Sequence, residues 1–170
     1  MNPTSGTRAG AIFSGIISTI LAAGMISCSP SVETDYSDIV NPFIGTDFTG
    51  NTYPGAQAPF GMVQLSPDNG LPGWDRIAGY FYPDSTIAGF SHTHLSGVGA
   101  GDLYDISFMP VTIPYNEAEQ PLGIHSKFSH DNEEASAGYY QVLLQDYGIN
   151  VELTATPRCG IQRYTFPGGK

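Results

Sequence analysis

The sequence predicts an all-β fold, an antiparallel β-sandwich. Between residues 39 and 114, prolines and glycines interrupt almost every window in which a helix could propagate. Residues 139–166 alternate apolar and polar side chains and are rich in Tyr, Val, Ile and Thr. Many short strands joined by frequent turns, with no helix longer than two turns, are typical of a sandwich.

The first 28 residues are predicted to be a signal peptide. Residues 11–26 are apolar and uncharged, but they fall short of the roughly 20 residues that span a bilayer. The run ends in MISCSP, which resembles a bacterial lipoprotein signal in which Cys28 becomes the lipid-bearing first residue. A plain signal peptide and an uncleaved anchor are the alternatives. We expect a protein of the cell envelope of a Gram-negative bacterium, either lipid-anchored to a membrane or periplasmic or secreted.

Residues 29–38 are polar and acidic, and we interpret them as a tether that holds a folded body away from the membrane. Residues 39–170 are predicted to form one β-sandwich domain. The sequence ends at RYTFPGGK, just after a predicted strand. A sandwich that stops there would leave a strand edge unpaired, so we expect the domain to be truncated at its C-terminus.

The charge of the chain argues against some partners. Five Lys and Arg stand against sixteen Asp and Glu after Cys28, a formal charge of −11, and basic residues are never clustered. An acidic surface of this kind excludes nucleic acid as a partner. Cys159 lies in a strand-like stretch, where we expect a buried apolar thiol. If Cys28 carries lipid, no disulfide can form within the chain.

The expected elements follow in chain order. Four short apolar segments are expected to lie between the turns of the first half: MVQLS, AGYFY, IAGFSH and ISFMPVTI. Residues 127–140 are interpreted as a strand end, an acidic loop and a new strand, and EEASA alone can form a helical turn. Three strands are predicted at Tyr139–Leu144, Ile149–Ala155 and Gly160–Phe166. The sequence Asp-Tyr-Gly at 146–148 supplies a tight turn, so the first two should pair as a hairpin.

The segment GFSHTHLSG contains two of the four histidines, His92 and His94. On a strand, residues two apart point to the same side, so the pair could bind one metal ion, as in a metal-dependent hydrolase. Such a site needs further ligands. A second interpretation is a buried polar network that fixes a glycine-rich corner. The third is the rim of a sugar site, because sugars need hydrogen-bonding groups beside apolar surface.

Trp74, the only tryptophan, follows Pro72-Gly73 in a predicted turn. A lone Trp serves either as a core anchor or as a ligand platform, and its place in a loop favours exposure. Asp75 and Arg76 are expected to hold that loop as an ion pair or as hydrogen-bond partners.

The stretch NPFIGTDFTGNTYPGA lacks the GxGxxG spacing and the following helix of a nucleotide loop. A phosphate site is therefore not expected there. Asp47, Asp102 and Asp105 are candidate carboxylates, each of which is better interpreted as a turn cap than as a catalytic acid.

Four segments together carry a family resemblance: VNPFIGTDFTGNTYPGAQAPFGMVQLSPD, GWDRIAGYFYPDSTIAGFSHTHLSGVGAGD, YDISFMPV and YYQVLLQDYGINVELTATPRCGIQRYTF. In this order they closely resemble the N-terminal region of glycoside hydrolase family ninety-two, over residues 39–166. The resemblance implies an exo-acting α-mannosidase that removes mannose from glycans and inverts the anomeric centre. It also implies an N-terminal β-sandwich, a larger C-terminal helical domain and an active site between them.

The resemblance implies different roles for the two domains. The acid, the base and the ligands of a calcium ion that grips mannose belong mainly to the helical domain, which is missing here. We therefore expect no catalytic residue in this chain, no calcium bound by this fragment and no activity from the chain alone. The resemblance implies that Trp74 and its neighbour Asp75 face the aglycone side of the substrate. It also places His92, His94 and the Asp47 loop at the domain junction.

The sequence thus predicts the carbohydrate-facing N-terminal domain of a calcium-dependent inverting exo-α-mannosidase. One alternative is a stand-alone carbohydrate-binding module that uses Trp74. A more remote one is a metal-dependent hydrolase that uses His92 and His94.

Overall fold

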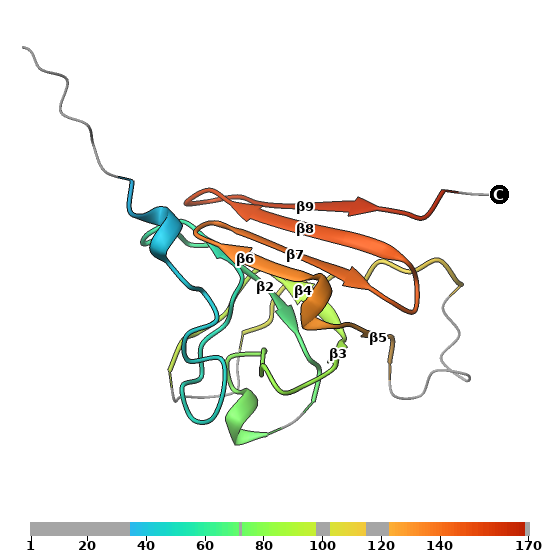
Figure 1. The fold of residues 1–170 in the computed structure, drawn as a ribbon, viewed down its shortest axis with the longest axis horizontal. Helices are drawn as coiled ribbons and strands as arrows, with labels where there is room; N and C mark the ends of the chain where they lie inside the picture. Colours follow the sequence, from blue (N-terminus) through green and yellow to red (C-terminus); the bar gives the residue numbers. More distant parts are fainter. Residues whose placement is uncertain (1–34, 72, 98–102, 115–122, 169–170) are drawn as a thin grey trace, which may run out of the picture. The chain divides into compact units, whose positions relative to one another are not determined.

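Figure 1 shows a computed structural model of the chain, which describes residues 35–71, 73–97, 103–114 and 123–168. The chain divides into two compact units, and the description below concerns the second, residues 36–170. The predicted signal peptide, Cys28, most of the predicted tether and Asp102 lie outside the described residues. Within those described ranges no helix has both the length and the apolar character needed to cross a membrane.

The described elements confirm an all-β fold with antiparallel pairing. Three single-turn 3-10 helices accompany the strands: η1 Ser37–Ile39, η2 Trp74–Arg76 and η3 His130–Asn132. The strands are β1 Ala56–Gln57, β2 Gln64–Asp68, β3 Thr86–Ile87, β4 Gly89–Ser91, β5 Ser126–Lys127, β6 Glu133–Ser136, β7 Tyr139–Leu144, β8 Ile149–Ala155 and β9 Gly160–Thr165. They form three sheets, ordered β1-β2-β4, β3-β5 and β6-β7-β8-β9.

The predicted hairpin of β7 and β8 is confirmed with the bounds expected from the sequence. Its register runs from Tyr139 opposite Thr154 to Leu144 opposite Ile149. Strand β9 ends one residue before the predicted bound. The EEASA segment is strand β6, not a helical turn, because its residues 133–136 pair with β7. Cross-strand pairing has overridden local helix propensity here.

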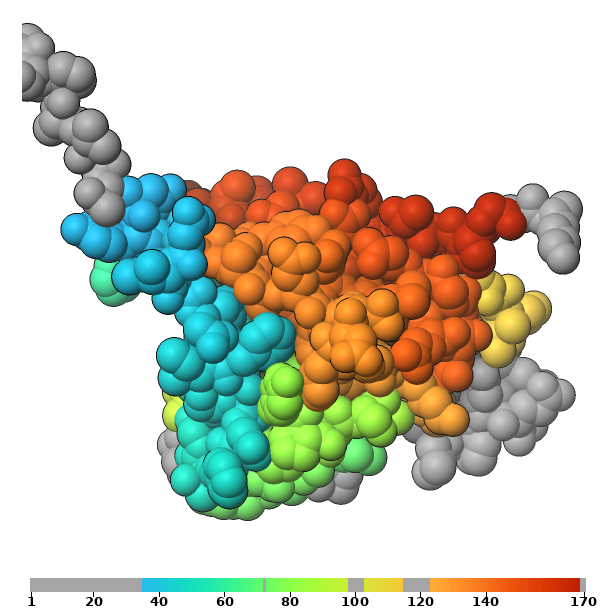
Figure 2. Space-filling view, viewed as in Figure 1, coloured from blue at the N-terminus to red at the C-terminus, as the bar shows by residue number. Residues whose placement is uncertain are grey.

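The core lies between the four-stranded sheet and the smaller sheet β1-β2-β4. On β7, alternate side chains are fully buried, as period-2 alternation requires for a strand with one face on a core. The main cluster joins both sheets and includes Ala56, Leu65, Phe90, Tyr140, Val142, Leu144, Val151 and Leu153. Burial of each large apolar side chain contributes about 1.5–3 kcal/mol. In Figure 2 the strands coloured orange to red lie directly against the cyan and green segments of residues 41–90.

Two of the apolar segments are not strands. In AGYFY, Gly79 has a φ of +87°, and a Cβ there would lie 2.6 Å from Asp68 Oδ1, so the chain turns at this residue. Asn69 secures the turn, because its backbone N–H donates to the Gly79 carbonyl and its side chain accepts from the Phe81 N–H. In ISFMPVTI only Phe108 pairs, in an isolated bridge to Phe90.

The expectation of a buried Cys159 is wrong. Cys159 lies in the turn between β8 and β9 and is exposed. Its N–H donates to the hydroxyl of Thr156, whose own N–H donates to the Cys159 carbonyl. This local bonding closes the hairpin and leaves the thiol outside the core.

A buried carboxylate joins the loop of residues 80–84 to the four-stranded sheet. The side chain of Glu133 is 1% exposed, and it accepts hydrogen bonds from the hydroxyls of Tyr80 and Tyr140. His130 Nδ1 lies 2.5 Å from the same carboxylate, while Nε2 lies 2.8 Å from the carbonyl oxygen of Tyr82. Burial, reinforced by the charge of Glu133, raises the pKa of both tyrosines, so their hydroxyls remain donors.

Candidate functional site

Trp74 is displayed on a short turn that ion pairs hold in place. Its side chain belongs to η2 and is 68% exposed, which confirms the expectation of exposure. Arg76, from the same turn, donates from Nε and Nη2 to the two carboxylate oxygens of Asp84, and from Nη1 to Asp75. The Asp84 side chain is only 7% exposed, and the Arg76 guanidinium also stacks 4.6 Å from the centre of the Phe81 ring.

These contacts confirm the predicted ion pair between Asp75 and Arg76 and add a stronger one. The bidentate contact with Asp84 fixes the orientation of the guanidinium plane. Hydrogen bonding and charge from Asp84, assisted by Asp75, raise the pKa of Arg76 above its ordinary value. The turn that carries Trp74 is therefore fastened to the loop of residues 80–84 by a permanently charged side chain.

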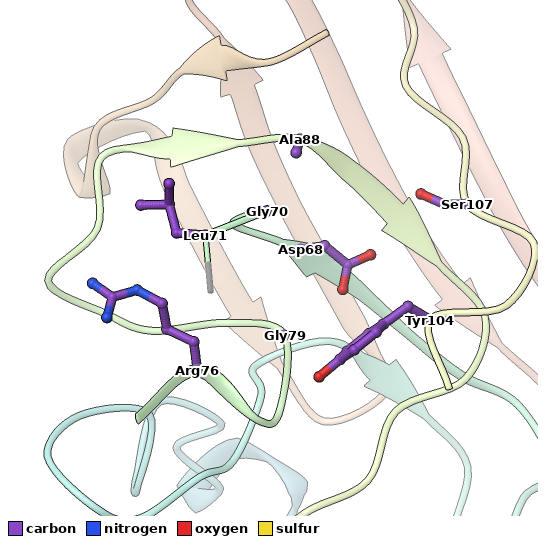
Figure 3. Close-up of a pocket in the computed structure, with 8 residues that line it drawn as sticks. All are labelled: Asp68, Gly70, Leu71, Arg76, Gly79, Ala88, Tyr104 and Ser107. Carbon is purple, nitrogen blue, oxygen red and sulfur yellow. The ribbon is translucent and has the colours of Figure 1, made fainter. Parts of the chain in front are cut away.

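A pocket of about 440 Å³ opens beside this turn, and Figure 3 shows the residues that line it. Its volume lies in the range of small-molecule sites, which measure roughly 300–1,000 Å³. Arg76 connects the pocket to the Trp74 turn. The described lining residues are Asp68, Gly70, Leu71, Arg76, Gly79, Ala88, Tyr104 and Ser107.

His94 is buried behind the pocket in a polar network. Its Nδ1 lies 2.7 Å from the carbonyl oxygen of Gln64, and its Nε2 lies 2.9 Å from Asp68 Oδ1 and 3.3 Å from the hydroxyl of Ser91. A carbonyl oxygen can only accept, so Nδ1 carries a hydrogen. Nε2 faces both the Asp68 carboxylate and the Ser91 hydroxyl. This arrangement agrees with the interpretation of a buried polar corner.

His92 has separate surroundings. Strand β4 ends at Ser91, so the premise that both histidines share one side of a strand is wrong. His92 Nδ1 lies 2.9 Å from the carbonyl oxygen of Ile106, and its ring meets Phe108 edge to face. The two imidazoles have different hydrogen-bond partners. Among the described residues no group of three or more His, Cys, Asp or Glu could hold a metal ion.

The candidate carboxylates Asp47 and Asp105 make hydrogen bonds within and between loops. Asp47 Oδ1 accepts from the N–H of Phe48, and the Asp47 carbonyl accepts from the N–H of Gly50. Asp105 accepts from the hydroxyl of Thr93, which in turn accepts from the Asp105 N–H. Both are exposed or partly exposed; Asp47 caps a turn as predicted, whereas Asp105 links two segments twelve residues apart.

The pocket depends on residues that sequence reasoning missed. Asp68 ends strand β2 in the segment QLSPD, and Tyr104 donates from its hydroxyl to the carbonyl of Ile77. The available signal was an aspartate at the end of an otherwise buried strand. The described lining includes none of the site residues proposed from the sequence, namely Trp74, Asp75, His92, His94 and Asp47. His94 nevertheless contacts Asp68, which does line the pocket.

Comparison with known proteins identifies the family. The model of the glycosyl hydrolase family 92 N-terminal domain matches residues 39–170. The chain belongs to glycoside hydrolase family ninety-two. An α-mannosidase of this family from Bacteroides thetaiotaomicron, whose structure is known alone and in complex with mannoimidazole, is 48% identical with a TM-score of 0.69. That match covers 77% of this chain and 18% of the mannosidase.

Two further comparisons extend the likeness. An inverting mannosidase from Bacteroides thetaiotaomicron VPI-5482 is 29% identical with a TM-score of 0.58, over 82% of this chain and 19% of that one. An uncharacterized secreted glycosidase of Arthroderma benhamiae is 27% identical over 142 residues, which are 79% of this chain and 18% of the relative. The chain thus spans about a fifth of the length of these relatives.

The calcium ion that the family resemblance implies does not fit the residues described here. Calcium takes six to eight oxygen ligands, several of them from carboxylates. No group of three or more acidic, histidine or cysteine side chains comes together in the described part of the chain. We therefore derive no step through a calcium ion from these residues.

Proposed function

We propose that this chain forms the carbohydrate-facing N-terminal domain of an inverting exo-α-mannosidase that releases mannose from glycans. Membership of family ninety-two and the likeness to an α-mannosidase solved with mannoimidazole support the substrate class. The likeness to an inverting mannosidase supports the stereochemistry. The observation that carries the role of this domain is the exposed, ion-pair-anchored Trp74.

An aromatic platform suits this role because sugars present apolar C–H faces as well as hydroxyl groups. An indole ring offers a large, flat apolar surface, and its N–H can meet a hydroxyl at the edge. A platform works best when it is already fixed, since ordering a loop on binding would weaken affinity. The contacts of Arg76 with Asp84 and Asp75 supply that fixation.

We assign the catalytic acid and base to a domain outside this sequence. An inverting glycosidase needs two carboxyl groups roughly 6.5–9.5 Å apart, one protonated and one able to activate water. Around the pocket, Asp68 faces His94, while Asp75 and Asp84 face Arg76. Each of these carboxylates already contacts a cationic or imidazole side chain. The calcium dependence of the whole enzyme is likewise assigned to that other domain.

We further propose that the domain is delivered to the cell envelope by residues 1–28 and anchored through lipid on Cys28. The apolar run before MISCSP and the polar residues 29–38 support this arrangement. The relative from Arthroderma benhamiae is named as a secreted glycosidase, which fits export of the domain.

The single tryptophan gives a direct test of the platform. Titration of the full chain with α-mannobiose should shift its tryptophan fluorescence in a saturable way, because the sugar displaces water from the exposed Trp74 ring. Replacement of Trp74 by alanine should remove the binding heat measured by calorimetry. The affinity should be weak, since only one wall of the site is present; tight binding would instead favour a stand-alone carbohydrate-binding module.

A matched control is Phe60→Ala, which removes another exposed aromatic ring at a distant position in the sequence. It should leave the binding heat unchanged. A fluorescence signal that does not respond to α-mannobiose at any soluble concentration would contradict the proposed role of Trp74.

A further inference from the structure

Asp68 presents a partly used carboxylate to the pocket. His94 Nε2 lies 2.9 Å from Oδ1, whereas no hydrogen bond reaches Oδ2 from the described part of the chain. The side chain is 14% exposed and lines the pocket. Figure 3 shows the carboxylate on the side of the pocket that Tyr104 lines. A carboxyl oxygen that no donor reaches can accept a hydrogen bond from a hydroxyl group.

The space beside this oxygen depends on a glycine. A Cβ on Gly79 would lie 2.6 Å from Asp68 Oδ1 and 2.9 Å from Tyr104 Cε1, and the φ of +87° disfavours any other residue there. Any side chain at this position would therefore close the gap between the carboxylate and the Tyr104 ring. The other contributors, Leu71 and Ala88, make the remaining wall apolar.

The charges around the pocket favour a neutral ligand. Arg76 is paired with both Asp75 and Asp84, and Asp68 is paired with His94, so each charged side chain in the described lining already has a partner. An anion would meet the open oxygen of Asp68 and be repelled. A cation would find a single carboxylate that is already partnered. A neutral molecule that combines hydroxyl donors with apolar C–H groups matches both the oxygen and the apolar wall.

We propose that this pocket is a binding subsite for one neutral pyranose ring. Its hydroxyl groups donate to Asp68 Oδ2, and its apolar face lies against Tyr104 and Leu71. His94 is the positioning residue, because it fixes the carboxylate from behind. The choice of a sugar among neutral polyols rests on the proposed function, whereas the open carboxylate and the pocket do not.

Titration of the full chain with methyl α-mannopyranoside, followed by NMR of the backbone amides, tests the subsite. The amides of Gly79 and Ala88 should shift in a saturable way.

Asp68→Asn keeps an oxygen for His94 but removes the charged acceptor, and should weaken the affinity by about tenfold or more. Ala88→Leu places a larger side chain in the pocket while keeping the Asp68 and His94 side chains, and should also abolish the shifts. The control Asp105→Asn, outside the described lining, should bind as the unmodified chain does.

The outcomes separate this proposal from the role of Trp74. Unmodified affinity in both Asp68→Asn and Ala88→Leu, or shifts that never saturate in the unmodified chain, would overturn the subsite. If the fluorescence response of Trp74 to α-mannobiose persists in that case, the platform stands and only the subsite fails. If Trp74→Ala abolishes that response while methyl α-mannopyranoside still binds in an Asp68-dependent way, the subsite acts independently of the platform.

Discussion

Replacement of Glu133 by alanine should lower the free energy of unfolding by about 4 kcal/mol, a value typical of breaking a buried polar network. The substitution removes the acceptor for the hydroxyls of Tyr80 and Tyr140 and for the imidazole of His130. Burial of these groups without a partner carries a desolvation penalty, and the lost side chain also leaves a cavity. Urea unfolding monitored by circular dichroism measures this change as a shift of the unfolding midpoint, with the slope of the transition unchanged.

Glu134 provides the matched control on the same strand. Its side chain is exposed, and its carboxylate contacts only the amide of Gln141 among the described residues. Glu134→Ala should therefore leave the unfolding midpoint almost unchanged. Glu133→Gln should fall between the two, because the amide retains one acceptor oxygen but no charge for His130. Equal midpoints for the two alanine variants would show that the buried network contributes nothing.

Replacement of Arg76 by methionine should destabilise the chain by about 3 kcal/mol, because it leaves the nearly buried Asp84 carboxylate without its cation. The loss should be concentrated in the loop that carries Trp74. We therefore expect tryptophan fluorescence to report unfolding at lower urea than circular dichroism, which follows the sheets. The α-mannobiose response of Trp74 should disappear under conditions where the sheets remain folded.

The variant Arg163→Met tests whether the loss of any positive charge would separate the fluorescence and dichroism transitions in this way. Arg163 pairs with Glu152 across β8 and β9, but its side chain is 71% exposed. Glu152 is 14% exposed, but it keeps the Tyr139 hydroxyl as a donor when Arg163 is lost, and the pair opens to water on the Arg163 side, so Arg163→Met should shift both transitions little and equally. Coincident fluorescence and dichroism curves for Arg76→Met, with sugar binding intact, would contradict the role of Arg76 as the anchor of the turn.

The β7–β8 hairpin was predictable because its sequence signals are local. Tyr139–Leu144 and Ile149–Ala155 alternate in the period of a half-buried strand, and a turn sequence separates them. The expectation of a helical turn in EEASA was wrong because this segment is a strand only through its pairing with β7, which no local pattern encodes. The prediction that Cys159 is buried was wrong for a related reason. The strand pattern on either side was extended across the turn between β8 and β9, where Cys159 lies.

The candidate site was predictable only in part. The loop position of Trp74 and the adjacent charges correctly indicated an exposed, ion-paired turn. Asp84, which anchors that turn more strongly, lies eight residues from Arg76, and only the folded loop brings them together. Of the three interpretations of the histidine pair, the metal site assumed that both residues lie on a strand, but β4 ends at Ser91. The contact of His94 with Asp68 spans 26 residues, beyond any local signal.

We propose that this chain shapes one wall of a mannosidase site and supplies neither the acid nor the base. Proton NMR of α-mannobiose mixed with the purified full chain tests it in a single sample, because the anomeric signals of bound disaccharide and of released mannose are distinct. We predict broadened disaccharide signals and no free mannose after prolonged incubation. Steady accumulation of mannose, in proportion to the amount of chain, would contradict the account.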